Sequence, residues 1–295
     1  MIASKKLRLV LRPTQVVPIM MVESHCHIMS EDQRKYPRDL GPNPAAWVRD
    51  LSGEEFLKLT SEAGVERAIL VQAFGAYRYD NNYVADVAAK YPERFVAVCI
   101  VDVLAPDAAD KLTYWVKERG CRGLRVVTWT QPETMLDDPR IEPVWRRATE
   151  LQIPVCVLTN FPQVSRLARV LERHPDLPIA LDHLGMPRLD DAPDFENEQA
   201  LFDLARHRNF HGKFSSWTIA AAGKNGKQGC VEFFRRLIDT FGAHRLMWGT
   251  NFPASNERSY RGFVEFAQQE LSFLLPEEKR WVFGETALNL WPMLR

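Results

Sequence analysis

The chain has 295 residues, of which 46% are hydrophobic and 26% are charged, and this composition is ordinary for a globular protein and excludes wholesale disorder. Its 38 basic and 38 acidic residues give a formal net charge of zero, so the charge balance shows no footprint for nucleic acid or an anionic membrane. No apolar run reaches the roughly 18 residues that a membrane-spanning helix needs. The length suits a single large α/β domain, since barrels of that class reach this size as one unit.

The first twenty residues differ from the rest of the chain. Met1–Met20 carries scattered basic residues but lacks a continuous apolar run and a small-residue cleavage site, so we expect no secretory signal. We predict that residues 1–20 form an N-terminal extension and that residues 21–295 form one domain. The five cysteines form no C-x-x-C pair and lie mostly in apolar runs, which is typical of reduced, buried thiols and favours a cytoplasmic protein.

Eight short apolar runs recur along the chain, and neighbouring runs start roughly 24 to 46 residues apart, which is the size of a βαβ repeat. The predicted strands are Met21–Ile28, Arg67–Ala73, Phe95–Val103, Gly120–Trp129, Ile153–Asn160, Leu177–Leu184, His211–Trp217 and Arg245–Thr250. Segments of helical periodicity separate most of them: Glu54–Ala63, Tyr83–Lys90, Asp107–Arg119, Glu142–Leu151, Val164–Arg173, Gln199–Arg206 and Val231–Phe241. Eight strand–helix units with nearly continuous apolar strands predict a parallel sheet closed into a single (β/α)8 TIM-like barrel.

The main alternative fold is an open dinucleotide-binding sheet. That fold requires a G-x-G-x-x-G fingerprint, which occurs nowhere in the chain. The glycine-rich segment Gly223–Gly229 also lacks the ending of a phosphate-binding loop, so we interpret it as a mobile loop, or a lid, after the seventh strand.

Polar side chains stand at the carboxyl ends of three predicted strands, where barrels of this class place their reactive groups. His25 and His27 end the first strand, and their spacing of two residues puts both imidazoles on one face. His183 ends the sixth strand, and Asn251 follows the eighth. Taken singly, each is explained as well by a satisfied buried histidine or a turn residue. Together at one barrel mouth they predict an active site.

Short motifs occur in a fixed order between Val22 and Trp291. They are Glu23-Ser-His-Cys-His27, Asp80-Asn-Asn-Tyr-Val84 with Tyr91-Pro-Glu-Arg-Phe95, Gly123-Leu-Arg125, Leu181-Asp-His-Leu-Gly185, Gly249-Thr-Asn-Phe-Pro253 and Phe283-Gly-Glu-Thr-Ala-Leu-Asn-Leu290. In this order they resemble the amidohydrolase superfamily, in its branch of lactonase-like hydrolases and related metal-dependent decarboxylases. The resemblance implies an amidohydrolase-type TIM barrel in which His25, His27 and His183 are active-site histidines.

Asn251 departs from the pattern of that superfamily, because most members carry an aspartate there, which activates the attacking water. An amide cannot accept a proton at neutral pH. Three interpretations stay open. The chain belongs to a sub-branch that naturally carries asparagine and uses another base, with His183 the first candidate; or it is a variant disarmed at this position to hold substrate; or it binds a small acid without turnover.

A catalytic zinc normally needs three good protein ligands and an open position for water. Metal-dependent relatives take these from the H-x-H pair, a strand-five histidine and the strand-eight aspartate, but strand five ends here in Thr159-Asn160. The pair His25 and His27, helped by His183 or Asn251, could hold zinc loosely. We therefore expect no required cofactor, while a divalent metal such as zinc stays open.

Six further side chains are candidates for substrate contact: Arg125, Trp129, Asn160, Trp217, Tyr79 and Arg78. Arg125 matches a position whose arginine, in similar lactonases, grips a substrate carboxylate, and a guanidinium fork suits a carboxylate. An internal salt bridge at the barrel rim explains Arg125 equally well. Packing between barrel and helices likewise explains Trp129 and Trp217.

These features predict a hydrolase that opens a small, carboxylated lactone of aromatic or sugar-acid breakdown by water attack on the carbonyl. In this prediction His183 takes the proton and Arg125 anchors the carboxylate. His25, His27 and Asn251 stabilise the oxyanion. The alternatives are a metal-dependent decarboxylase or hydratase on the same scaffold, and a silent barrel that binds a small acid. We expect a small-molecule substrate and no nucleic-acid or membrane partner, while a homo-oligomer stays open.

Overall fold

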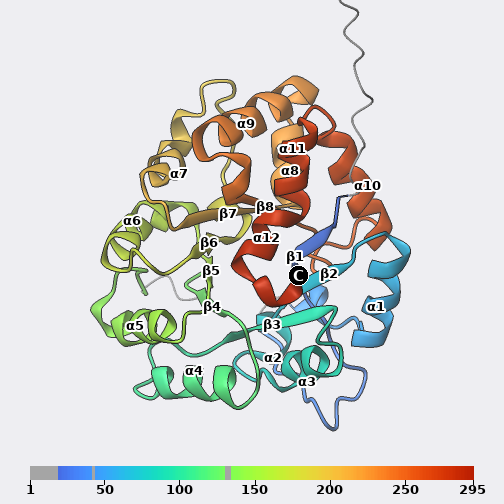
Figure 1. The fold of residues 1–295 in the computed structure, drawn as a ribbon, viewed down its shortest axis with the longest axis vertical. Coiled ribbons are helices and arrows are strands. Elements are labelled where there is room, and N and C mark those ends of the chain that lie inside the picture. Colours follow the sequence, from blue (N-terminus) through green and yellow to red (C-terminus); the bar gives the residue numbers. More distant parts are fainter. Residues whose placement is uncertain (1–18, 42–43, 130–133) are drawn as a thin grey trace, which may run out of the picture.

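The computed structural model describes residues 19–41, 44–129 and 134–295, so the predicted extension lies almost wholly outside the described residues. Eight parallel strands follow one another in chain order around a ring, as Figure 1 shows. They are β1 (Val22–Cys26), β2 (Arg67–Val71), β3 (Phe95–Ile100), β4 (Leu124–Val127), β5 (Val155–Leu158), β6 (Ile179–Leu181), β7 (Phe210–Ser215) and β8 (Leu246–Gly249). Each overlaps a predicted apolar run, so the eight-stranded parallel fold is confirmed.

The ring closes between the first and last strands at their carboxyl ends. The backbone N–H of Asn251 donates to the carbonyl of His25 at 2.8 Å. The backbone N–H of His27 donates in turn to the carbonyl of Phe252, also at 2.8 Å. These bonds hold the H-x-H segment beside the turn after β8, so the two predicted site segments are neighbours. The fold is a single TIM-like barrel.

Helices alternate with the strands along the chain, and most of them surround the ring of strands in Figure 1. They are α1 (Gly53–Glu62), α2 (Phe74–Tyr77), α3 (Asn82–Lys90), α4 (Ala108–Lys117), α5 (Glu142–Glu150), α6 (Val164–Arg173), α7 (Gln199–Phe202), α8 (Ser216–Gly223), α9 (Gly226–Phe241), α10 (Tyr260–Glu270), α11 (Pro276–Arg280) and α12 (Thr286–Leu290). Every predicted helix is present, with α7 continued by a 3-10 helix to Arg206. Their apolar stripes cover the outer faces of strands that are buried along most of their length.

The glycine-rich segment Gly223–Gly229 is not the mobile loop that its composition suggested. α8 ends at Gly223 and α9 begins at Gly226, so nearly the whole segment is helical or joins two helices. Gly226 has a φ of +78°, which lets the chain reverse between the helices. Cys230 and Phe233 of α9 are buried, and this packing outweighs the weak helix propensity of the segment.

The C-terminal helix α12 seals the end of the barrel where the strands begin. Its Leu288 and the following Trp291 pack against inward-facing strand residues such as Ile69 and Val98. The indole N–H of Trp291 donates to the carbonyl of Arg122, just before β4, at 2.9 Å. Because this end is plugged, a ligand must approach from the opposite end, where the strands terminate.

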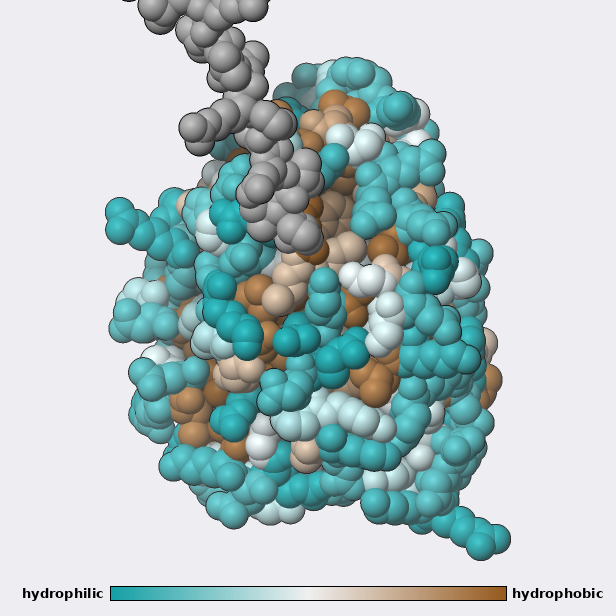
Figure 2. Space-filling model, turned by 45° about the vertical axis from the view of Figure 1, so that its right-hand side comes forward, coloured by the Kyte–Doolittle hydropathy of each residue, from teal (hydrophilic) through white to brown (hydrophobic). Residues whose placement is uncertain are grey.

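The surface turned forward in Figure 2 is mostly hydrophilic, with smaller apolar patches between polar side chains. Large exposed apolar residues such as Val48, Tyr114, Leu275 and Met293 come from different parts of the chain. Among the described residues no helix is long and apolar enough to cross a membrane. All five cysteines are buried and unpaired.

Candidate functional site

His27, just beyond β1, presents one ring nitrogen to a cavity at the carboxyl ends of the strands. Its Nδ1 lies 2.8 Å from the carbonyl oxygen of Val71. A carbonyl can only accept a hydrogen bond, so Nδ1 carries the proton and Nε2 holds a lone pair. Burial, followed by the nearby Arg125 charge, lowers the pKa of His27 to about 3, so the ring is neutral at pH 7.

His25, at the same face of β1, is turned to protein partners instead. The ring centroids of His25 and His27 are 5.1 Å apart, as expected for residues two positions apart on one strand. Nδ1 of His25 lies 3.3 Å from Oδ1 of Asp182, and Nε2 lies 3.4 Å from Nη2 of Arg125. Since a guanidinium only donates, Nε2 accepts and Nδ1 carries the proton toward the carboxylate. Burial lowers the pKa of His25 well below its ordinary value.

Asp182 is the centre of a buried charge network under the histidines. Its side chain is fully buried and accepts from Nε of Arg125 at 2.8 Å. The ammonium of Lys213, on β7, lies 3.5 Å from the other carboxylate oxygen and 3.0 Å from Sγ of Cys156. Burial opposes ionisation, but His25, Lys213 and Arg125 hold the pKa of Asp182 well below its usual value. Asp182 therefore stays charged and keeps its cationic partners in place.

His183 sits in a left-handed turn directly after β6. Its φ is +55°, and Leu184, Gly185 and Met186 also have positive φ. Such conformations are unfavourable for residues with a side chain and are commonest at functional sites. Nδ1 of His183 lies 2.8 Å from the hydroxyl of Ser215, and burial lowers the pKa of the ring to about 4. The ring lies 4.7 Å from that of His25, centroid to centroid.

Asn251 is also left-handed, with a φ of +62°, which asparagine and aspartate tolerate better than most residues. Its side chain is buried, and Nδ2 donates to the hydroxyl of Ser255 at 3.2 Å. The amide is thus oriented by the turn after β8, with one side-chain N–H left over after the bond to Ser255. An aspartate would fit the same backbone conformation.

These elements surround a cavity of about 280 Å³ at the open end of the barrel. Its lining includes His27, His183, Asn251, Arg125, Arg78, Trp129 and Trp217, together with Trp47, Phe74, Leu158 and Met186. Trp129 and Trp217 remain 44% and 42% exposed, so their indoles form the solvent edge of the cavity. The predicted convergence of strand-end residues therefore holds for most of the candidates.

Two predicted substrate contacts are not part of this lining. Asn160 lies two residues beyond the end of β5, whose last residue, Leu158, lines the cavity instead. Tyr79 packs its ring edge-on against Phe74, with centroids 5.6 Å apart, but only Phe74 lines the cavity. Position in the sequence near a predicted strand does not fix the direction of a side chain.

The amidohydrolase family profile matches residues 22–293. The chain belongs to the amidohydrolase family. The resemblance inferred from the motifs is confirmed, and family membership supports a hydrolase. An L-fucono-1,5-lactonase of Burkholderia ambifaria is 28% identical over 256 residues, which cover 83% of this chain and 87% of that protein.

Solved structures of related proteins show the same fold. A structure from Pseudomonas putida, assigned as a 2-pyrone-4,6-dicarboxylic acid hydrolase, has a TM-score of 0.78 at 21% identity and covers 94% of this chain and 99% of that one. An amidohydrolase from Burkholderia multivorans with bound zinc has a TM-score of 0.72 at 23% identity, covering 92% and 99%. At these identities the likeness establishes the barrel, while the chemistry rests on the residues of this chain.

The side chains at this site do not form the three-ligand set that a zinc ion normally needs. Among the described residues no three His, Cys, Asp or Glu side chains are placed to hold a metal. The predicted pair cannot chelate as it stands, because Asp182 and the guanidinium of Arg125 occupy the two nitrogens of His25. A cation beside His25 would also face that guanidinium. The expectation that no cofactor is required remains a prediction.

Several residues that hold the site in place were not predicted from the sequence. Glu23, fully buried on β1, accepts from the backbone N–H of His25 at 2.8 Å and of Thr250 at 2.9 Å. Burial raises the pKa of this carboxyl to about 7. Lys213 and Asp182 were also missed as partners. The available signal was a charged residue inside an otherwise apolar strand or at its end, which is rare unless the charge is paired.

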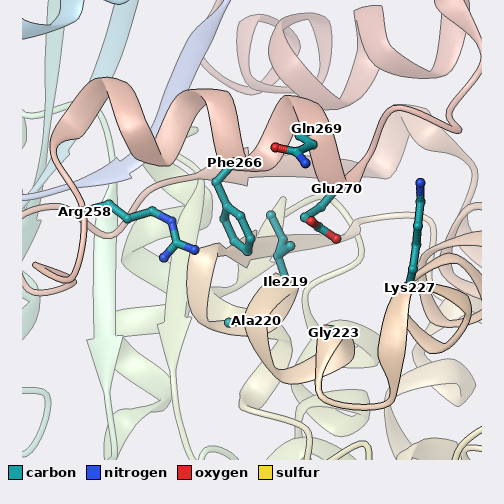
Figure 3. A pocket seen from close by; sticks show the side chains of 8 residues that line it. All are labelled: Ile219, Ala220, Gly223, Lys227, Arg258, Phe266, Gln269 and Glu270. Atoms are coloured by element: carbon teal, nitrogen blue, oxygen red, sulfur yellow. The ribbon is translucent and has the colours of Figure 1, made fainter.

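A second hollow lies outside the barrel between α8 and α10, as Figure 3 shows. Its volume is about 400 Å³, and its walls include Ile219 and Phe266. The guanidinium of Arg258 lies 4.3 Å from the ring centroid of Phe266. None of the predicted site residues lines this hollow, so it is separate from the candidate site.

Proposed function

We propose that this amidohydrolase opens a small, carboxylated lactone by adding water to the ring carbonyl. The observation that carries the proposal is the meeting of two neutral imidazoles, His27 and His183, with Asn251 in one cavity. Within the described part of the chain, neither imidazole has a hydrogen-bond partner at Nε2. The similarity to an L-fucono-1,5-lactonase supports a lactone as the substrate class. A cavity of about 280 Å³ suits a single small ring.

His27 is the stronger candidate for the group that takes the proton from water. Because the Val71 carbonyl holds its Nδ1–H, Nε2 offers a lone pair to the cavity at neutral pH. The same tautomer cannot donate to an oxyanion from Nε2. This assignment therefore exchanges the roles that the sequence suggested, in which His183 was the base and His27 an oxyanion donor.

His183 is placed to donate to the carbonyl oxygen. When the Ser215 hydroxyl donates to Nδ1, the ring carries its proton on Nε2. The remaining Asn251 N–H and the Nη1 group of Arg125 add two further donors at the cavity. One such donor is typically worth about 3 kcal/mol of barrier. A lactone suits this apparatus because its alkoxide or enol leaving group departs more readily than an amide nitrogen.

The charge of the cavity favours a substrate with a carboxylate. Two guanidinium groups, those of Arg78 and Arg125, line it, and no acidic side chain of the described residues does. Aromatic rings, including Trp47 and Trp217, would pack on the faces of the ring. The buried, unpaired thiols support a cytoplasmic location, where aromatic or sugar-acid breakdown would supply such a compound.

A panel of carboxylated and neutral lactones tests the proposal, with ring opening followed by NMR for the wild type, Asn251→Asp, His27→Gln and His183→Ala. Hydrolysis by the wild type that is lost in His27→Gln supports the mechanism. A gain of several orders in Asn251→Asp would identify position 251 as disarmed. If neither the wild type nor Asn251→Asp hydrolyses any lactone, the proposal is contradicted. Metal-dependent release of carbon dioxide would instead favour the decarboxylase alternative. Binding of a lactone without turnover would favour a barrel that binds a small acid and catalyses nothing.

A further inference from the structure

Two arginines line the cavity, and among the described residues only the guanidinium of Arg125 is hydrogen-bonded to protein groups. Arg125 gives its Nε to Asp182 at 2.8 Å and its Nη2 to His25 at 3.4 Å. These two groups form one edge of the guanidinium fork, so that edge is occupied by protein partners. Nη1 and the second N–H of Nη2 remain for a substrate. Because Asp182 and His25 fix the orientation of the guanidinium, Arg125 is placed as a donor beside the reacting carbonyl.

The guanidinium of Arg78, unlike that of Arg125, is not held by protein partners among the described residues. Within the described residues its guanidinium makes no ion pair and no side-chain hydrogen bond, and its carbon Cζ lies 5.2 Å from the ring centroid of Phe74. It lines the same cavity and is only partly buried. Its backbone is held at a φ of +50°, a strained conformation for arginine. The whole fork of Arg78 is available to a ligand.

The surroundings of Arg78 hold its side chain over the cavity. Gly41 lies directly beside it, so that a Cβ built there would stand 3.0 Å from Nη2 of Arg78. Gly75 gives the same close approach to Trp47, whose Nε1 would stand 2.2 Å from a Cβ at that position. Arg78 therefore rests between an aromatic ring and a loop that has no side chain at the point of contact.

We propose that Arg78, and not Arg125, binds the carboxylate of the substrate and thereby selects anionic lactones. The inference rests on the proposed lactone hydrolysis and names the residue that decides which lactones are accepted. A guanidinium without protein partners can pair with a carboxylate through two parallel N–H···O bonds, whereas the charge of Arg125 is already paired with Asp182 and its Nε–Nη2 edge is engaged. The carboxylate then lies toward α2, while the ring carbonyl faces His27 and His183 in the interior.

The test compares 5-oxotetrahydrofuran-2-carboxylate with its carboxamide, which differ in charge at one position of the same lactone. We expect Arg78→Met to raise KM for the carboxylate about 10- to 100-fold, because a charge-assisted, two-pronged bond is lost. KM for the carboxamide should change less than about threefold, and kcat should change little for either compound. Arg78→Lys, which keeps the charge but not the fork, should lie between wild type and Arg78→Met.

Arg49→Met is the matched control, since Arg49 is an exposed arginine of the loop before α1 that does not line the cavity. If steering by overall charge were responsible, Arg49→Met would raise KM as much as Arg78→Met. An equal rise in KM for both lactones in Arg78→Met would overturn the inference. So would a preference for the carboxylate that is lost only in Arg125→Met.

Binding of 5-oxotetrahydrofuran-2-carboxylate, followed as an increase in Tm, keeps the inference testable if no lactone is hydrolysed. A rise in Tm that Arg78→Met abolishes and Arg49→Met preserves would support the anchor while the proposed hydrolysis failed. A rise in Tm equal in wild type and Arg78→Met, or no rise in wild type, would contradict the anchor.

Discussion

The floor and the walls of the cavity contain the same kinds of side chain in opposite states. On the floor, His25, Arg125, Asp182 and Lys213 are bound to one another. On the walls, His27 and His183 each use one ring nitrogen on the protein and direct the other to the cavity, and Arg78 has no ionic partner among the described residues.

The difference shows how a barrel of near-neutral composition holds reactive groups. Buried charges are stable only when they are paired and hydrogen-bonded, so the groups of the floor hold one another in place, and of these four only Arg125 also lines the cavity. In the proposed function, the groups without protein partners are those that bind the substrate. The two histidines of the H-x-H motif then have different tasks: His25 positions Arg125, and His27 faces the substrate.

Replacing the wall histidine should produce the largest effect. His27→Gln removes the basic nitrogen, and we expect kcat to fall about 100- to 10,000-fold, the range of general base catalysis. The free energy of unfolding should change far less. His211→Gln on β7 is the control, because that histidine does not line the cavity and should leave kcat within about twofold. Steady-state kinetics on the best lactone of the panel would measure both.

Removing the central carboxylate of the floor should instead lower the free energy of unfolding. Asp182→Asn leaves the charges of Arg125 and Lys213 without their anion, and we expect the free energy of unfolding to fall by about 3 to 5 kcal/mol in urea titrations. The control is Asp107→Asn, which removes an exposed i,i+4 pair with Lys111 and should cost less than about 1 kcal/mol. Similar losses in the two variants would show that the floor is not a coupled network.

The pH profile distinguishes buried wall histidines from ordinary ones. With a pKa of about 3 for His27 and about 4 for His183, both rings stay neutral until the solution is strongly acidic. Because the neutral base is the active form, kcat/KM should be flat from pH 8 to about 5 and fall only near pH 4. A decline that begins near pH 6.5 and persists in Glu23→Gln would contradict the assignment.

Glu23 supplies the control for that profile, because its pKa of about 7 places its titration in the neutral range. Any change near pH 7 that disappears in Glu23→Gln belongs to this carboxyl. A change that persists in the variant would belong to another group and would weaken the assignment of neutral histidines.

A smaller effect should follow from removing the hydroxyl that orients His183. Ser215→Ala frees Nδ1, so the ring is no longer held in the tautomer that donates from Nε2. We expect kcat to fall about 3- to 10-fold with little change in KM, as for the loss of one neutral hydrogen bond. Ser255→Ala, which acts on Asn251, is the companion variant. An unchanged kcat in Ser215→Ala would place His183 outside the donor set.

Much of the fold, and part of the site, can be predicted from local patterns in the sequence. The apolar runs predicted all eight strands because parallel strands covered on both faces need continuous apolar residues. The two-residue spacing correctly put the rings of His25 and His27 on one face. What the pattern could not give is which ring would be engaged, because the partner Asp182 is 157 positions from His25 and meets it only once the barrel closes.

Other features depended on tertiary packing. Trp47 and Phe74 entered the cavity from a loop and a short helix for which no periodic signal exists. Asn160 and Tyr79 stayed out of it, although Asn160 follows its strand as closely as Trp129 does and Tyr79 is next to Arg78 in the chain. The segment Gly223–Gly229 became helical because α9 docks on the barrel. In each case the deciding interaction is with residues distant in sequence.

The most direct test of the central claim is to run the reaction of the best lactone in water enriched in oxygen-18 and to analyse the product by mass spectrometry. The account predicts one heavy oxygen in the newly formed carboxylate, absent when His27→Gln replaces the wild type. A product of unchanged mass, or one that has lost carbon dioxide, would contradict water attack at the lactone carbonyl.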